Sequence, residues 1–180
     1  MLRLRHNRLM RFLACEAGVS AVEFALIAPI MITTYFGASE LCNLLLADRK
    51  VTNVTAATTD LVAQALQISD SGMNDIFTAS SAIMQPYPLS SLQIVVTSAV
   101  ADANGNVTVG WSDAYNAGAY SPGSAFVLPD GLIQPGGSVI VTEVHYTYDS
   151  PIGEFWTGGF TVNDTFYQRP RRVMQIARNS

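Results

Sequence analysis

The longest apolar stretch of the chain lies near its N-terminal end and predicts a membrane-spanning helix. Residues 24–39, FALIAPIMITTYFGAS, carry no formal charge, and past Glu40 the segment to Ala47 adds LCNLLLA. The apolar span is about 22–24 residues long with one acid inside it, which is sufficient to cross a bilayer as a helix. We therefore expect a transmembrane helix over residues 19–47, kinked or loosened at Pro29.

A helical pattern continues beyond this span without a Gly or Pro break. Apolar or small positions recur at steps of three and four residues, namely Leu44, Ala47, Val51, Val54, Thr58, Leu61 and Ala65. One helix from Val19 to Leu66, roughly 70 Å long, is therefore expected, with its second half against a globular head. We expect the polar face of this half to meet water: Asn53, Thr55, Thr59, Asp60 and Gln64.

The remaining pattern predicts a second helix and a small antiparallel sheet. Ser71 is expected to cap the helix, whose apolar face (Met73, Ile76, Phe77, Ile83, Met84) ends before Pro86. Strands are expected at 92–100 and 106–111, joined by a turn at 102–105 that contains Asn-Gly. A third strand, 138–148, places Val139 and Val141 on one face and Ile140, Val144, Tyr146 and Tyr148 on the other. A final strand or strand pair over 160–176 carries Arg169, Arg171 and Arg172.

These elements predict an α+β protein in which the second half of a long N-terminal helix packs on the sheet. Residues 48–180 number 133, enough for one head domain with its own core. The two cysteines, Cys15 and Cys42, precede this domain, so packing alone must hold it together. The Gly- and Pro-rich stretch 112–137 is expected either to contact a partner or to cover a sheet edge.

Charge is distributed unevenly along the chain. Residues 1–18 carry four arginines (Arg3, Arg5, Arg8, Arg11) against Glu16, whereas residues 19–180 carry 6 basic and 13 acidic groups. Basic residues ahead of an apolar span stay on the cytoplasmic side, which places the acidic head across the membrane. The arginines could instead form a nucleic-acid-binding arm, but the adjoining apolar span and acidic body argue against it, and we expect no nucleic-acid partner.

Glu23 stands at the start of the apolar run, where a carboxylate is costly unless it has a partner. Cleavage after Gly18 would give Val19 a new ammonium group four residues ahead of Glu23, about one helical turn away. A processing site and its charge complement would then share one short motif. Glu40 is either a carboxylate at the membrane edge, which we favour, or the partner of a neighbouring subunit.

A secretory signal peptide is the main alternative for the N-terminal segment. Gly37, Ala38 and Ser39 offer small residues for its cleavage. Glu23 at the start of the apolar run and the helical pattern beyond the supposed cut both argue against this alternative.

Residue types that support catalysis are sparse. His145 and Glu143 share a strand face, but without a third ligand or a nucleophile we interpret them as a surface contact. The series Asp102, Asn104, Asn106 resembles the start of a calcium loop whose later ligands are missing. We therefore expect no enzyme activity, cofactor, metal site or small-molecule substrate.

The leader, Gly18, the Glu23-Phe24 pair and the run AVEFALIAPIM resemble the start of TadE-like and TadF-like proteins, minor pseudopilins of tight-adherence (Tad) pilus systems. The segments VTVGWSDA, FVLPDGL and VTEVHYTYDSP also resemble this group, so the similarity runs from Arg11 to about Pro151.

This resemblance implies a pilin-like fold and three segments: a cytoplasmic leader at 1–18, a single-pass transmembrane helix at 19–47 and a periplasmic head at 48–180. It implies cleavage by a prepilin peptidase between Gly18 and Val19, with Glu23 and Phe24 serving in assembly and recognition. Expected partners are the bacterial inner membrane, the peptidase, and other pilus, pseudopilin and Tad assembly components. The alternatives are an unprocessed bitopic scaffold and an exported periplasmic binding domain.

Overall fold

The computed structural model describes residues 17–129, 131–150 and 159–179. By its contacts the chain divides into two compact units, Met1–Cys42 and Asn43–Ser180. Most of the expected leader, with Cys15, lies outside the described residues, as do Asp130 and Pro151. The expected segment boundaries at 18 and 47 stay predictions.

A single long helix, α2 (Ala17–Gln64), runs through both units and confirms the expected continuity of the apolar pattern. It passes Pro29 without ending. Proline supplies no backbone N–H, which leaves one carbonyl a turn earlier without its helical donor. Thr33 Oγ1 donates to the Pro29 carbonyl and Thr34 Oγ1 to the Ile30 carbonyl, both at 2.8 Å. These hydroxyls therefore satisfy their own hydrogen-bonding needs within the helix.

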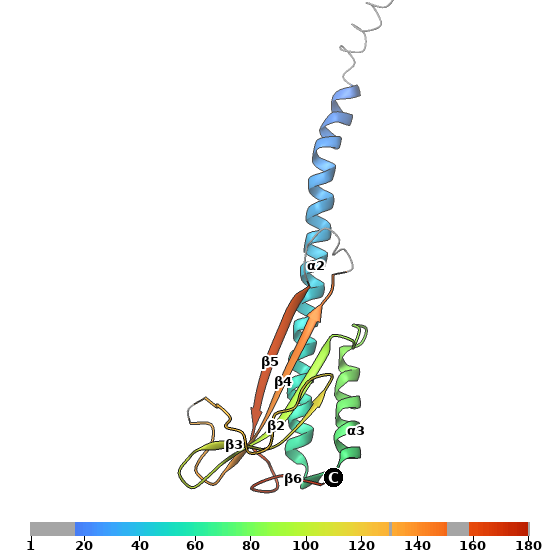
Figure 1. Ribbon diagram of the computed structural model, residues 1–180. Coiled ribbons are helices and arrows are strands. Elements are labelled where there is room, and N and C mark those ends of the chain that lie inside the picture. The colour runs from blue at the N-terminus through green and yellow to red at the C-terminus, as the bar shows by residue number, and fades with distance from the viewer. Residues whose placement is uncertain (1–16, 130, 151–158, 180) are drawn as a thin grey trace, which may run out of the picture. The chain divides into compact units, whose positions relative to one another are not determined.

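The second unit has a four-stranded antiparallel sheet in the order β3-β2-β4-β5. Its strands are β2 (Leu92–Ala101), β3 (Val107–Tyr115), β4 (Ser138–Tyr148) and β5 (Phe160–Gln168). A short parallel pair joins β1 (Gln67–Ile68) to β6 (Ala177–Arg178). Together with α2 this sheet confirms the expected α+β class (Figure 1).

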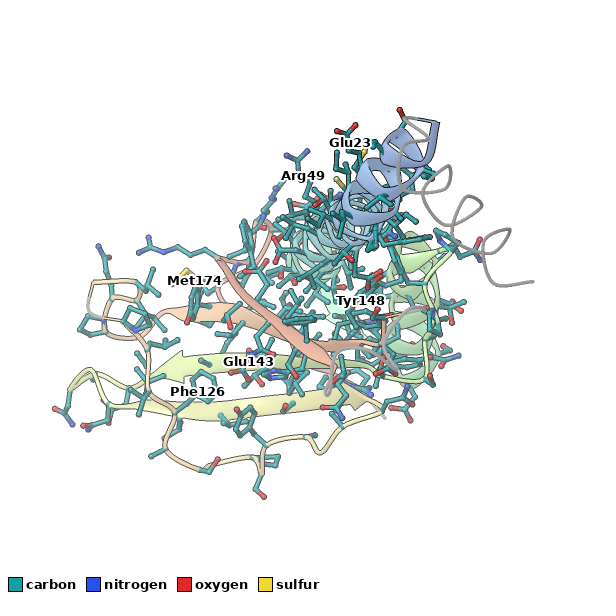
Figure 2. All side chains as sticks on the ribbon, turned by 90° about the horizontal axis from the view of Figure 1, so that it is seen from above. Glu23, Arg49, Phe126, Glu143, Tyr148 and Met174 are labelled. Carbon is teal, nitrogen blue, oxygen red and sulfur yellow. The ribbon has the colours of Figure 1, made fainter. Side chains whose placement is uncertain are left out.

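The main core lies between this sheet and two helices, the second half of α2 and α3 (Asp70–Ser81). From α2 it takes Ala47, Val51, Val54 and Val62, and from the sheet it takes Leu92, Ile94, Val96, Trp111, Ile140, Val144, Tyr146 and Tyr148. Tyr148 lies among the side chains between sheet and helices (Figure 2). The prediction that the second half of the long helix packs on the sheet is therefore confirmed.

The expected division of α2 into an apolar and a polar face is partly wrong. Leu61 is exposed and Val62 takes the buried position, while Thr55 and Thr59 are fully buried instead of facing water. Their hydroxyls donate to the carbonyls four residues earlier, at 2.8 and 2.6 Å. A threonine that bonds to its own helix presents only a methyl group to the sheet, and this permits its burial.

The start of α3 also differs from the prediction. Ser69, not Ser71, is the N-cap, and its hydroxyl accepts a hydrogen bond from the backbone N–H of Gly72 at 3.2 Å. Ser71 instead shares a 3.0 Å hydroxyl contact with Ser69. The apolar face that was expected for this helix is confirmed at Met73 and Phe77, which are buried. A 3-10 turn, η1 (Ala82–Met84), follows and adds the fully buried Met84 to the core.

The hairpin predicted from Asn-Gly is present, although β3 extends four residues beyond the expected end at Trp111. Its strands shift register between Ser98 and Ala99, opposite Gly110. A Cβ on Gly110 would lie 3.0 Å from the Val100 side chain and 3.2 Å from the Ser98 carbonyl. A side chain at this position would therefore crowd the bulge, and glycine avoids that crowding.

The stretch after β3 serves as cover for the sheet. Residues 123–126 run beside the first half of β3, with hydrogen bonds from Val109 N to Ser124 O and from Phe126 N to Val107 O. Phe126, Leu128 and Ile133 then pack on a second cluster formed by Ala99, Val139 and Val141 on the outer sheet face. Phe126 lies farther from α2 than Tyr148 does (Figure 2). Of the two expectations for residues 112–137, the structure confirms that this stretch covers an edge of the sheet. The prediction that Val139 and Val141 lie on the opposite face of β4 from Ile140, Val144, Tyr146 and Tyr148 is also confirmed.

The segment 160–176, expected to form a final strand or strand pair, contains β5 and a connection at 169–176, and β6 begins directly after it. Its backbone and side chains link several elements of the unit. Arg171 N donates to Ala63 O at the end of α2, and Trp111 Nε1 donates to Ile176 O at 2.8 Å. Arg178 pairs with Asp113 from β3 and Asp70 from α3. These hydrogen bonds, to Asp113 above all, raise the pKa of Arg178.

Replacing Ile140, which is fully buried in the main core, tests the packing. We expect Ile140→Ala to lower the free energy of unfolding by about 2–5 kcal/mol, because it removes buried methyl groups and leaves a cavity. Denaturant unfolding of the full chain in detergent measures the change. Val127→Ala, at a side chain that is 93% exposed, is the control and should stay within about 0.5 kcal/mol. Equal losses for the two variants would contradict the assignment of the core.

The turn of the hairpin predicts a pH effect. Asp102 accepts a hydrogen bond from the Asn106 side chain at 2.9 Å and from the backbone N–H groups of Asn106 and Asn104 at 2.8 Å. The Asn106 side chain is the main cause that lowers the pKa of Asp102 below 3.8. The stabilisation from this carboxylate is therefore present above pH 3.8 and is lost as the pH falls through the lowered pKa.

An NMR titration of the Asp102 carboxyl checks this prediction. Asn106→Ala should raise the pKa of Asp102 toward 3.8, because the side-chain donor is removed while the backbone donors stay. Asn104→Ala keeps every donor to Asp102 and should leave the pKa unchanged. An unchanged pKa in Asn106→Ala would refute the hydrogen-bond assignment.

Candidate assembly segment

The first part of α2 exposes apolar side chains on every side. Apart from Leu44, which packs partly on the core, its large hydrophobic residues from Val19 to Leu46 are roughly half or more exposed: Val19, Val22, Phe24, Leu26, Ile27, Ile30, Met31, Ile32, Tyr35, Phe36, Leu41, Leu45 and Leu46. A helix that is apolar all round is stable only when lipid or other protein surrounds it. A helix from a soluble core would be mostly buried, whereas the most apolar window of α2 has none of its residues buried. By length and composition, α2 is therefore a candidate membrane span.

The four residues expected to serve in processing and assembly lie together in the first two turns of α2. Gly18, Val19, Glu23 and Phe24 are all exposed, and Phe24 is 72% exposed. Val19 and Glu23 are separated by four residues, so their side chains are neighbours along one helix face, about 6 Å apart along the axis.

Gly18 has open space around it. A Cβ built on this residue would meet no atom within 4 Å. Its φ is also not in the left-handed region, since it is absent from the positive-φ glycines of the described chain. The fold therefore gives no reason for glycine at this position, and alanine would fit without strain.

Glu23 projects outward from α2 (Figure 2). Within the part of the chain that the structure describes, its carboxylate makes no hydrogen bond or ion pair. In hydrocarbon the charged carboxylate of Glu23 would have no partner. It would therefore need a cation that does not belong to the described residues. Geometry thus brings Glu23 near the chain position where cleavage would create an amine.

Glu40 is the other acid of the apolar segment and behaves differently. Its Oε1 is buried and has no hydrogen-bond partner among the described residues. The sequence marked Glu40 as an unusual acid in an apolar helix, but nothing in the sequence indicated that one of its oxygens is shielded from water.

His145 and Glu143, the pair considered for acid–base or metal chemistry, bond to other residues. His145 Nδ1 lies 2.7 Å from Asn163 Oδ1, and the Tyr120 hydroxyl bonds to Glu143. Burial of Tyr120, followed by its bond to Glu143, raises the pKa of the phenol. Across the described ranges, no group of three or more His, Cys, Asp or Glu side chains could hold a metal ion.

Sequence reasoning missed two polar clusters. Asp60 accepts from Gln64, Gln168 and Arg171, and Arg178 joins Asp70 to Asp113. Both clusters join residues more than 60 positions apart, so no local pattern marks them. The one available signal is that basic residues are few in the acidic head, which makes each of them a candidate for pairing.

Comparison with known proteins supports the interpretation of the N-terminal segment. No curated protein and no solved structure matches the chain. The match to a family model covers residues 18–60, so the wider resemblance, from Arg11 to about Pro151, stays a prediction. The model is that of TadE-like proteins, and residues 18–60 of this chain are similar to it.

Proposed function

We propose that this protein is a minor pseudopilin that takes part in the assembly or initiation of a Tad pilus and has no catalytic activity of its own. The observation that carries the proposal is that the family match and the exposed apolar part of α2 overlap. The TadE-like match covers residues 18–60, and this range contains the exposed large apolar side chains of α2 from Val19 to Leu46. A pilus-associated family and a candidate membrane helix both fit a membrane-bound subunit.

In this proposal a prepilin peptidase removes the leader between Gly18 and Val19. The new ammonium group of Val19 and the carboxylate of Glu23 then give each subunit one cation and one anion at the start of its apolar helix. In an apolar medium both groups are costly when alone, and pairing between neighbouring subunits offsets much of that cost. Phe24, which is exposed beside Glu23, would contribute packing area to the same contact.

We further propose that the basic leader lies in the cytoplasm and the acidic head in the periplasm, with α2 crossing the inner membrane once. The arginines of the leader and the net negative charge of the rest support this orientation. Partners would be the membrane, the peptidase, and other pilus subunits and Tad assembly components.

An unprocessed bitopic scaffold would have the same apolar helix and the same head but would keep its leader. A periplasmic domain released by signal peptidase would begin near Glu40 and leave the membrane. The mass of the mature N-terminal peptide separates the three: a start at Val19 supports the pseudopilin, a start at Met1 the scaffold, and a start near Glu40 the released domain.

Gly18→Ala should leave some or all of the precursor uncut, because the peptidase would select glycine before the cut, while the fold has room for alanine. N-terminal peptide mapping of membrane extracts gives the cleaved fraction. Gly37→Ala is the matched control, since Gly37 is also an exposed helical glycine with no atom within 4 Å of a built Cβ. Normal maturation of Gly18→Ala would show that the cleavage site is assigned wrongly.

Glu23→Val should leave membrane insertion intact and reduce the number of pili. Removing one partner of a buried ion pair costs about 3–5 kcal/mol, which corresponds to a loss of more than about 100-fold in subunit association. Pilus counts by electron microscopy and resistance to alkaline extraction are the two measurements. Thr34→Val, which also places valine at an exposed position of the same helix but removes no charge, should leave both unchanged. Normal pilus numbers in Glu23→Val would remove the ion-pair role.

A further inference from the structure

The sequence of α2 contains only two basic residues, Arg49 and Lys50, and they differ in their surroundings. Lys50 Nζ donates to the Ile83 carbonyl at 2.9 Å, so this amine is held within its own unit. Arg49 is exposed and projects away from the sheet (Figure 2). Among the described residues it has no hydrogen-bond or ion-pair partner. With respect to the described residues, Arg49 is thus an exposed cation without a partner of its own chain.

Glu40 offers the complementary charge. A carboxylate at a membrane edge is expected to keep its oxygens in water, but Oε1 of Glu40 is buried and unpartnered within the described chain. Leaving a buried acceptor without a hydrogen bond is costly, and more so for a charged group. Oε1 is shielded by the chain itself, but Glu40 as a whole is only partly buried, so a cation from another copy can approach the carboxylate from its accessible side. A cation there would offset the cost of the unpaired oxygen, and we therefore consider the second role of Glu40, pairing with a neighbouring subunit.

We infer that Glu40 of one copy of this chain pairs with Arg49 of a second copy, and that this contact joins parallel helices with an axial offset. Nine helical residues separate the two positions, which corresponds to about 14 Å, or two and a half turns. A contact between two different positions of the same chain is heterologous and leaves each copy with one unused group. Such a contact can therefore be repeated from copy to copy.

The inference rests on the proposed function, in which the Val19 amine of one copy pairs with Glu23 of another. The axial offset that the pair of Glu40 and Arg49 requires has the same direction as the offset of that contact. To bring the Val19 amine of one copy level with Glu23 of another, the first copy moves about 6 Å toward the head end of the helix. To bring Glu40 of the first copy level with Arg49 of the other, it moves about 14 Å in the same direction. The long, flexible arginine side chain can bridge part of the difference.

The helix surface next to Glu40 would allow a second helix to approach closely. Gly37 lies three residues before Glu40, on the same helix face, and a Cβ built on it would meet nothing within 4 Å. Small residues at this spacing let helix backbones come together in a membrane. Close approach would shield the ion pair from water and strengthen it.

Two differently tagged copies of the full chain, expressed together and extracted in detergent, test the pair by co-precipitation. When both copies carry Glu40→Gln, or both carry Arg49→Gln, recovery of the second copy should fall at least tenfold. When one copy carries Glu40→Gln and the other Arg49→Gln, one of the two arrangements keeps an intact pair. Recovery should then return to about half that of the wild type.

Asp48→Asn is the matched control, since Asp48 is an exposed acid beside Arg49 and should not affect recovery. Arg49→Lys, which keeps the charge at an exposed position, should retain most of the recovery even if substitutions of Glu40 disturb the helix. No gain in the mixed experiment, equal loss with Asp48→Asn, or no co-precipitation of wild-type copies would overturn the inference.

The N-terminal mass of the same samples separates this inference from the proposed function. A start at Val19 together with failure of the mixed experiment would refute only the pair of Glu40 and Arg49. A start at Met1 in every sample would refute the proposed processing, whatever the result of the co-precipitation.

Discussion

The packing of the second half of α2 on the sheet is the contact on which the rest of the head depends. Ala47, Val51, Val54 and Val62 are fully buried, and they meet residues from β2 and β4 that are fully buried as well. Small and β-branched side chains on the helix allow it to lie close to the sheet. The strands could not keep their apolar face dry without this helix, because a sheet of this size needs a covering layer.

The same helix serves two environments. Up to Leu46 its large apolar side chains are exposed, apart from Leu44, which packs partly on the core, whereas from Ala47 onward one stripe is buried against protein. An exposed apolar surface of this length requires lipid or neighbouring helices, and the TadE-like match over residues 18–60 spans both parts. The similarity to TadE-like proteins therefore lies within the helix.

Much of this architecture follows from local patterns. Helix α2, the hairpin at Asp102–Asn106 and the two faces of β4 were predictable because periodicity and turn chemistry act over a few residues. The burial of Thr55 and Thr59 was not predictable, since a hydroxyl counts as polar until its bond to the helix backbone is known. Ser69 and Ser71 are both good caps, and only the backbone geometry decides between them.

The candidate site divides in the same way. Gly18, Val19, Glu23 and Phe24 could be proposed from the sequence because they fall within one short motif, and their roles stay predictions. The shielded oxygen of Glu40, and the lack of a partner for Arg49 among the described residues, could not be predicted, because burial and pairing are properties of the folded chain. Ion pairs between distant residues, such as Asp60 with Arg171, also could not be predicted, because no local sequence pattern indicates them.

The segment from Arg169 to Asn179 follows every other described element in the chain, yet it binds the end of α2, β1, Trp111 and the Asp70–Asp113 pair. These contacts can form only after residues 169–179 have been synthesised. In a nascent chain that lacks them, the indole N–H of Trp111 has no Ile176 carbonyl, and Asp70 and Asp113 have no Arg178. The links that join α2, β1, β3 and α3 through this segment are therefore the last of the head to become available during synthesis.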